Sequence, residues 1–448
     1  MKLSRNVPSY RRAEPRNGTR TARSIGAVFV GVLCVIGTLA SAGVASAAMG
    51  TRSAASVLNV PVFEPFSGSE ASTGPTLLAG CLSAVKTINA AGGVLGHRLN
   101  CRSVDSGSDP ADAVPAVSRM LTSVPNIVLV MGPGSVAAPT VPVISAAHIP
   151  MISGSGSPQY DKNTDKYFYR AGPSDSLQGD AEAYWAWQHG YKTAAEVFTN
   201  DPGAQTIPGA ITPLYTKYGG KIVKSITLAP DQTSYRTEAA ELIAAHPQVI
   251  FTETDPQTAA TFWSEAVQTS SKLPPVIGDQ ETTLQPWVQA VLPVAKLNLV
   301  SLTISAAAPT AGFRLYQKEL LTLSSQIKNP SQYATFPGTI SFYDGVVLSA
   351  LAMDAAKSVN PPTYQPYMTR VTGVPSRGKT VVYTYAQGVA ALRAGKTIDY
   401  SGAGGVIAFN KYHNVAVPFS ADKLNDSSGA LQNIGSVPLS VLLKLAAG

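Results

Sequence analysis

The sequence predicts an α/β protein made of two doubly wound parallel sheets. Strand-like apolar runs alternate with helical patterns along almost the whole chain, which is typical of parallel sheets covered by helices. With 448 residues, the chain is longer than one hydrophobic core comfortably supports, so we expect two similar lobes. Small, hydroxyl-rich turns follow several strands, as they do at the ligand-binding ends of open sheets.

Residues 1–48 have the pattern of an export signal. Basic residues precede an apolar run from Ile25 to Ala40, and small residues follow, with cleavage expected after Ala47 or Ala48. The seven Lys and Arg of this segment, less the single acid Glu14, supply +6 of the formal +7, so the mature chain is near +1. That balance predicts no nucleic-acid footprint.

We therefore expect an exported protein of the periplasm, cell envelope or extracellular space. Arg11 and Arg12 raise the twin-arginine route as an alternative, but "SYRRAEPRNG" lacks the apolar residues that should follow the pair. No cysteine is suitably placed for lipid attachment, because Leu33 precedes Cys34 and because "LLAGC", which ends at Cys81 and does fit the pattern, falls inside the first predicted helix. The mature protein is then either free or held by an uncleaved segment from Ile25 to Ala40.

Two cysteines, Cys81 and Cys101, remain once the signal is removed. An oxidising compartment and an even count favour a disulfide that ties the first helix to the second strand. Two buried thiols are the alternative.

The first lobe begins with four strands and three helices. The strands are expected at "SVLNVPVF", "HRLNCRSV", "NIVLVMG" and "IPMIS", and the helices begin near Thr76, Pro110 and Ala137. The double glycine Gly92–Gly93 follows the first helix. A dinucleotide-binding turn needs the reverse order of strand, glycines and helix, so these glycines end the helix instead.

A second series follows, with strands expected at "AAEVFTN", "KIVKSITLA", "QVIFTET" and "PPVIGD". Helical stretches are expected over 204–218, 235–245 and 256–270. Past "LVSLTIS" the pattern is helical through "FRLYQKELLTLSSQI" and "SFYDGVVLSALAMDAA", and the chain ends with the strand-like runs "GGVIAF" and "VAVPFS".

No motif supports catalysis, a metal site or a cofactor. "GVPSRGKT" (373–380) fits the phosphate-loop spacing, but the stretch before it, "YQPYMTRVT", suits a helix better than the required buried strand. We expect a loop between two late helices there. The five histidines show no metal-ligand spacing, and no G-x-S-x-G elbow occurs.

Two turns are candidates for holding an anion. "MGPGSVAAP" follows the third strand and "ISGSGSPQY" the fourth. Gly134, Ser135, Ser155 and Ser157 could bind a carboxylate through backbone amides and hydroxyls. Ordinary serine caps and turns are the alternative.

Two acids also stand at strand ends. "TETDP" places Asp255 after one strand of the second lobe, and "GDQET" places Glu281 after the next. Either could anchor an ammonium group, because an unpaired buried charge is costly. The alternative is that each caps the helix that follows it.

These segments together resemble the type I periplasmic binding proteins of the branched-chain amino acid receptor family, which supply ligands to ABC transporters. The resemblance spans about Ser56 to Ser420 and is carried by "INAAGGVLGHRL", "DSGSDPADAV", "PVISAAHIPMISGSGS", "FYRAGPSDSLQG" and "YSGAGGVIAFNKYHN". It implies three crossover strands near Gly172, Leu302 and Asn414. Lobe 1 would hold residues 49–172 and 303–413, and lobe 2 residues 173–302 and 414–448.

The resemblance also implies a ligand site. The turns at Gly134, Ser135 and at Ser155, Gly156, Ser157 would hold the ligand's carboxylate and amino groups. Lobe 2 would contribute Ala204, Asp255, Gln280 and Glu281, and the later helical segment Tyr343. The aromatic that often follows the family's Asn-Asp pair is missing after Asn200 and Asp201, so a wider pocket is expected. Asn410 and Asn414 stand where the family favours Asp and Gly.

We therefore expect a monomeric, non-enzymatic solute-binding protein without a cofactor. It would capture an amino acid or a similar small polar carboxylate or amide by lobe closure and deliver it to an ABC transporter permease. A sensory or adaptor protein of the same fold is the alternative, and an exported enzyme is the third possibility.

Overall fold

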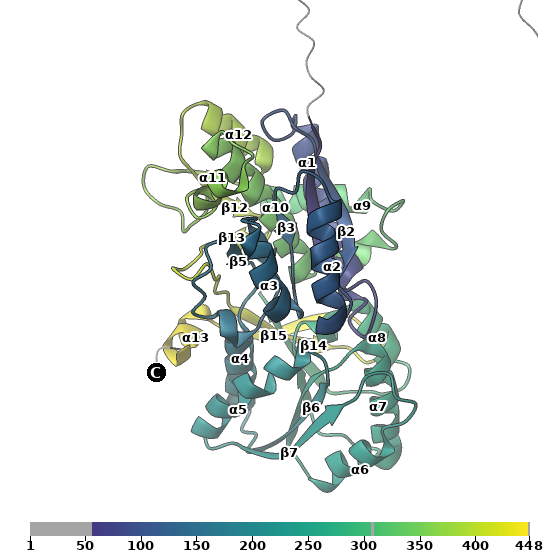
Figure 1. Cartoon of the computed structure of the whole chain (residues 1–448). Helices are drawn as coiled ribbons and strands as arrows, with labels where there is room; N and C mark the ends of the chain where they lie inside the picture. Colours follow the sequence, from purple (N-terminus) through teal and green to yellow (C-terminus); the bar gives the residue numbers. More distant parts are fainter. Residues whose placement is uncertain (1–55, 306–308, 447–448) are drawn as a thin grey trace, which may run out of the picture. The chain divides into compact units, whose positions relative to one another are not determined.

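A computed structural model describes residues 56–305 and 309–446. The expected export signal lies outside these residues. Within them the chain forms two large sheets, each covered by helices on both faces, and one small sheet. The α/β fold with two parallel-sheet lobes is confirmed. We call the part built on the first sheet lobe 1 and the part built on the second sheet lobe 2 (Figure 1).

The sheet of lobe 1 is fully parallel, in the order β2-β1-β3-β4-β5. Its strands are β1 (Leu58–Glu64), β2 (Leu99–Asp105), β3 (Val130–Met131), β4 (Met151–Ser153) and β5 (Phe168–Arg170). Every residue of β1 is buried, because both faces of the sheet are covered. Leu58, Val60 and Val62 pack into one core, whereas Phe63 packs into the other.

Helices from two distant parts of the chain cover one face of this sheet. They are α1 (Thr73–Ala90), α9 (Ala311–Leu321) and α10 (Pro337–Ala356), and α2 (Pro110–Ser123) and α3 (Ala137–Ala146) cover the other face. Helices α1 and α10 approach so closely that a Cβ on Gly80 would lie 2.2 Å from the carbonyl oxygen of Thr339. The disulfide between Cys81 and Cys101 is present and ties α1 to β2.

The sheet of lobe 2 has the order β15-β14-β10-β9-β8-β6-β7. Its parallel strands are β6 (Thr193–Thr199), β7 (Lys221–Leu228), β8 (Val249–Glu253), β9 (Val276–Gly278) and β10 (Leu299–Ile304). They repeat the order of lobe 1. Strands β14 (Phe419–Leu424) and β15 (Leu431–Val437) add an antiparallel edge.

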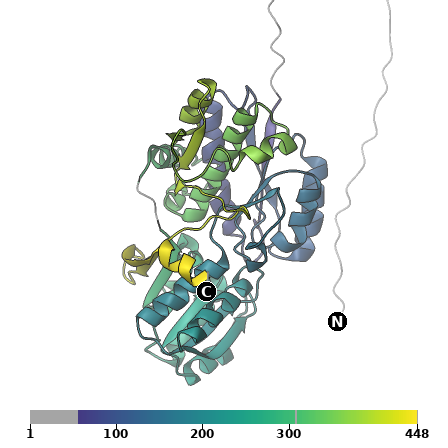
Figure 2. The ribbon, with the colours of Figure 1, turned by 90° about the vertical axis from the view of Figure 1, so that its left-hand side faces the viewer.

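Helices also cover both faces of the second sheet. One face carries α6 (Arg236–Ala244), α7 (Pro256–Thr269) and α8 (Gln285–Val291), and the other carries α4 (Asp175–Gln188), α5 (Pro208–Lys217) and α13 (Leu439–Ala446). Figure 2 shows the yellow C-terminal segment crossing to the teal part of the chain, where α13 lies against α4. No helix of the described residues is long and apolar enough to span a membrane.

Four segments in the later part of the chain differ from expectation. Of "VAVPFS", only the part from Phe419 onward joins the sheet, because the ring nitrogen of Pro418 cannot donate a hydrogen bond to the neighbouring strand. Strand β15 and helix α13, which follow it, were not predicted. "GGVIAF" forms only β13 (Gly405–Val406). The loop 373–379 leads into strand β11 (Thr380–Val382) of a small sheet with β12 (Ile398–Gly402), not into a helix. "YQPYMTRVT" contains the last residue of α11 (Pro361–Tyr364) and a single 3-10 turn over Gln365–Tyr367, not a longer helix.

Candidate functional site

A cavity of about 350 Å³ lies at the carboxyl ends of the strands of both lobes. In each sheet the strand order reverses beside the first strand, between β1 and β3 in lobe 1 and between β6 and β8 in lobe 2. Loops diverge at such a point and leave room for a ligand. Glu64 ends β1 and Glu253 ends β8, and both line the cavity.

The structure brings most of the predicted site residues to this cavity. Gly134 and Ser135 follow β3, and the turn Ser155–Ser157 follows β4. Residues from both lobes therefore line one space: Gly134, Ser135, Ser155, Gly156, Ser157, Asp255, Gln280 and Glu281. That these residues contact a ligand stays a prediction.

Two predicted site residues do not line the cavity. Ala204 is fully buried at the start of a single 3-10 turn, and its N–H donates to Asp201 Oδ1. Tyr343 points into the core of lobe 1, with its ring 5.2 Å from that of Tyr316. The reason is its place on α10, because Ser341 and Phe342 occupy the side of that helix that faces the cavity.

The turn after β3 is occupied by the protein's own acids. The hydroxyl of Ser135 donates to Oε2 of Glu70, in the loop that follows β1. A Cβ on Gly134 would lie 2.8 Å from Oε2 of Glu64, so a side chain at this position would have to displace that carboxylate. The groups expected to bind a ligand carboxylate thus already face carboxylates of this chain.

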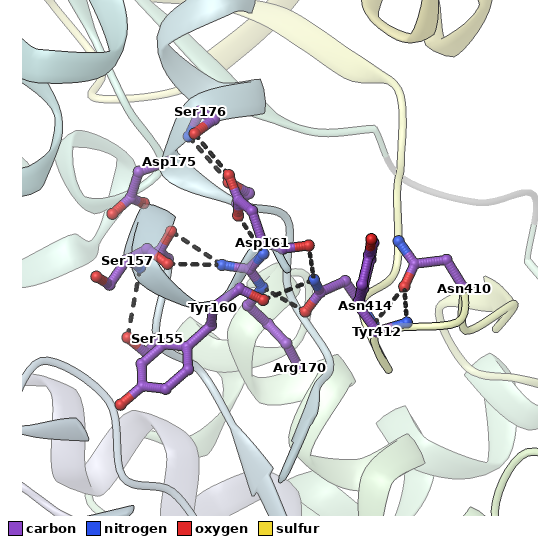
Figure 3. A network of polar contacts seen from close by, with 12 residues as sticks. Ser155, Ser157, Tyr160, Asp161, Arg170, Asp175, Ser176, Asn410, Tyr412 and Asn414 are labelled. Atoms are coloured by element: carbon purple, nitrogen blue, oxygen red, sulfur yellow. Dashed lines mark hydrogen bonds and ion pairs between the residues drawn. The ribbon is translucent and has the colours of Figure 1, made fainter. Parts of the chain in front are cut away.

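The turn after β4 is held by internal hydrogen bonds (Figure 3). The N–H of Ser155 donates to Ser153 Oγ at 3.0 Å, and that of Ser157 donates to Ser155 Oγ at 3.4 Å. Arg170 Nη1 donates to the carbonyl oxygens of Gly156 at 3.1 Å and Ser157 at 3.0 Å. The conformation of the turn Ser155–Ser157 is therefore held by hydrogen bonds from within the protein.

Arg170 joins that turn to two of the connections between the lobes. It ends β5 and is 1% exposed. Its Nη2 contacts Asp161 Oδ1 at 2.5 Å, and the other carboxylate oxygen of Asp161 accepts from Ser176 Oγ in α4. Its Nε donates to Asn414 on the segment that leads to β14. The sequence predictions did not include Arg170, although a charged residue ending a buried strand is a signal that could have identified it.

The cavity is lined by acids and by no base. Among the described residues that line it there is no Lys, Arg or His. We use the name pocket carboxylates for the eight acids that line it: Glu64, Glu70, Asp175, Asp201, Glu253, Asp255, Asp279 and Glu281. Only Asp255 and Glu281 were predicted as site residues.

Burial raises the pKa of the lobe 1 carboxylates. The pKa of Glu64 rises well above its ordinary value because the group is buried and because the Glu70 carboxylate is near. Neither oxygen of Glu64 has a hydrogen-bond partner. The Gly134 amide approaches and partly favours the charged form, but it lies outside hydrogen-bonding geometry.

Glu70 meets Asp201 across the two lobes. Glu70 Oε1 and Asp201 Oδ1 each lie 3.3 Å from where a Cβ on Gly203 would stand. Burial and the charge of Asp201 raise the pKa of Glu70 to about 8, and burial also raises the pKa of Asp201. Glu70 Oε1 has no hydrogen-bond partner, and the proximity of the two carboxyl groups favours the protonated form of one of them.

Lobe 2 repeats this electrostatic pattern. Burial and the charges of its neighbours raise the pKa of Glu281 to about 8, and burial raises that of Asp279 to about 7. The pKa of Glu253 is raised well above its ordinary value by burial and then by Asp279. Asp175 begins α4, and burial raises its pKa to about 6. Near neutral pH, several of these groups therefore hold protons while the cavity has no cation.

Asp255 caps helix α7. Its Oδ1 accepts from the N–H groups of Gln257 at 3.1 Å and Thr258 at 3.0 Å, and Pro256 follows at the first helical position. The capping alternative is thus present in the structure. Asp255 also lines the cavity, so a ligand contact stays a second prediction for the same side chain.

Two α/β lobes with a cavity at the facing strand ends define the class of two-lobed solute-binding proteins. A family model described as periplasmic binding protein matches residues 57–409, and the chain belongs to that family. The comparison with curated protein sequences gives no match.

Solved structures of this class share the fold. A leucine-binding protein, LivK, of Thermotoga maritima has 14% identity over 85% of this chain and 99% of its own, with a TM-score of 0.69. LivJ of Streptococcus pneumoniae, in complex with isoleucine, has 19% identity over 85% and 100%, with a TM-score of 0.67. A solute-binding protein of R. palustris, in complex with benzoate, has 17% identity over 86% and 97%, also with a TM-score of 0.67.

Proposed function

We propose that this chain is the exported solute-binding component of an ABC transporter, and that it captures a small, amine-bearing solute of amino-acid size. The observation that carries the proposal is the cavity of about 350 Å³ at the strand ends of both lobes. Small-molecule sites have volumes of this order and few polar groups in fixed positions. The structural neighbours are reported with amino acids and with benzoates, so the fold alone does not select the ligand.

Capture would follow from closure of the lobes. Carboxylates and hydroxyls stand on both walls, and a solute that contacts both walls favours the closed arrangement by the free energy of those added contacts. The chain then presents the loaded form to a permease. No catalytic step is proposed.

Two measurements test this function. A thermal-shift screen over amino acids, amides, amines and small carboxylates should give a hit, because a ligand at a hundredfold excess over its Kd stabilises the fold by about 2.7 kcal/mol. A strain lacking the gene should lose uptake of that labelled solute and regain it on complementation. Undiminished uptake in the deletion strain would overturn the transport function and favour a sensory role.

A further inference from the structure

Glu64 is a buried carboxylate that nothing in the described residues satisfies. It is 1% exposed, both its oxygens lack a hydrogen-bond partner, and it lines the cavity. Gly132 and Gly134 pack against it so closely that a Cβ on either would lie 2.8 Å from one of its oxygens. Buried acids in proteins are normally paired or hydrogen-bonded, so the place beside Glu64 suits a donor that a ligand brings.

The opposite wall offers further acceptors. Glu253 and Glu281 line the lobe 2 side, and Oε1 of the neighbouring Gln280 also lacks a partner. A solute carboxylate placed between these walls would face carboxyl groups on both sides and no cationic side chain, and each of those groups that is ionised would repel it. Positively charged groups are favoured on both sides.

The acceptors do not form a metal site. Among the described residues, no three or more acids or other ligating side chains are arranged to hold a metal ion. Apolar side chains line the space as well: Leu77, Ile207, Leu284, Trp287, Phe336 and Phe342. A hydrocarbon spacer between two charged nitrogens matches this combination better than a compact inorganic cation does.

We propose that the solute is a small organic dication, with one ammonium-like group held by Glu64 and Glu70 in lobe 1 and the second by Glu253 and Glu281 in lobe 2. This inference rests on the proposed function and specifies its substrate class. Binding converts protonated carboxyl groups into ion-paired carboxylates, so the protein releases protons to the solvent as the dication enters.

The test is isothermal titration calorimetry of the whole exported chain with 1,4-diaminobutane, and with n-butylamine as the matched probe that has one charge. We expect the diamine to bind at least about tenfold more tightly than the monoamine, because its second charged nitrogen adds charge-assisted hydrogen bonds that the monoamine cannot make. Titration in two buffers of different ionisation enthalpy should show proton release. Equal affinity for the two amines would overturn the two-site assignment.

A pair of variants tests the role of Glu64. Glu64→Gln should weaken diamine binding about tenfold, whereas Glu182→Gln should change it less than about twofold. Glu182 is equally buried, at 1% exposed, but it does not line the cavity. Circular dichroism checks folding, and Glu281→Gln replaces Glu64→Gln if the latter does not fold. Unchanged diamine affinity in the folded variants would overturn the inference.

Two further outcomes separate the inference from the proposed function. Binding of leucine or benzoate without binding of the diamine, or binding of calcium in its place, would overturn the dication and leave solute capture standing. If none of these probes binds, the dication proposal is also overturned. The uptake assay with the deletion strain then tests the transport function independently of it.

Discussion

Arg170 Nε donates a 3.0 Å hydrogen bond to Oδ1 of Asn414, a residue 244 positions further along the chain. The backbones of the two segments are also hydrogen-bonded, because the N–H of Arg170 donates to the carbonyl oxygen of His413 at 2.9 Å. Arg170 is the last residue of β5, from which the chain continues to α4 of lobe 2, and Asn414 lies on the later segment that leads to β14. Two passages between the lobes are therefore tied to each other beside the cavity.

Replacing Arg170 should destabilise the protein. Arg170→Met leaves the carbonyls of Gly156 and Ser157 and Asn414 Oδ1 without their donor, so we expect a loss of at least about 2 kcal/mol in urea unfolding. Arg236→Met is the control, because that side chain is 80% exposed and its ion pair with Glu265 contributes about 0 to 1 kcal/mol. Equal effects in the two variants would contradict a special role for Arg170.

The free protein should lose stability as pH rises from about 5 to about 8. Seven pocket carboxylates have a raised pKa, so the folded state binds more protons than the unfolded state in this range: Glu64, Glu70, Asp175, Asp201, Glu253, Asp279 and Glu281. Their contribution is complete below the unfolded pKa of about 4 and is lost as pH passes the folded values, with a slope of up to about 1.4 kcal/mol per pH unit per group.

Urea unfolding at several pH values, without added solute, measures this slope. Glu281→Gln removes one titrating group whose folded pKa is about 8, so the slope should become shallower in that variant. Stability that rises toward pH 8 in the parent protein would show that the pocket carboxylates are ionised in the free state.

Gly156 should not accept a side chain. A Cβ there would lie 1.7 Å from Asp175 Oδ1, and the other oxygen of Asp175 accepts from Thr206 Oγ1, so the acid cannot easily move. Gly156→Ala should cost about 1 to 3 kcal/mol in unfolding experiments. Gly209→Ala is the control, because nothing lies within 4 Å of its Cβ position and alanine favours helix α5. An unchanged free energy of unfolding in Gly156→Ala would mean that α4 and the turn Ser155–Ser157 can move apart at little cost.

The disulfide should contribute about 3 kcal/mol. Cys81 and Cys101 are 20 residues apart, and linking them restricts the unfolded chain. A Cys81→Ser, Cys101→Ser protein should therefore unfold at lower urea concentration than the oxidised parent. Thiol titration of the unfolded, unreduced exported chain should find no free thiol, and two free thiols would contradict the bond.

Asp255 should affect stability through its cap. Asp255→Ala removes the acceptor for Gln257 and Thr258 and should cost about 1 kcal/mol, whereas Asp255→Asn keeps an acceptor and should cost only a few tenths. Thermal unfolding of the two variants measures the difference. If Asp255→Asn instead loses solute binding at unchanged stability, the side chain acts as a ligand contact as well as a cap.

The strand ends could be found from the sequence because apolar runs are followed by turn residues. Ligands bind at the carboxyl ends of strands in open sheets, and from this rule Ser155 and Glu281 were predicted to lie in the site; both line the cavity. The same rule applies to Glu64 in "VPVFEP" and to Glu253 in "TETDP", which were not among the predicted site residues. These two acids end buried strands and were identifiable in principle.

Other features could not be found because they depend on distant contacts. Helix α10 is buried almost all round, so no periodic pattern tells which side Tyr343 faces. Strand β15 has mostly exposed residues and joins the sheet only through its pairing with β14. The contact between Arg170 and Asn414 joins segments whose proximity only the folded chain establishes.

The position of the polar cavity wall on loops has an evolutionary consequence. Loops beyond the strand ends carry most of the polar side chains of the wall, whereas its apolar side chains, such as Leu77 and Trp287, belong to the cores. Selection can therefore exchange recognition residues in the loops without disturbing the packing that keeps the fold, and lineages with 14% to 19% identity still share it. Glu64 is an exception, because Gly132 and Gly134 pack against its carboxylate and a side chain at either glycine would have to displace it. Substitution of these glycines should therefore follow, and not precede, a change at Glu64.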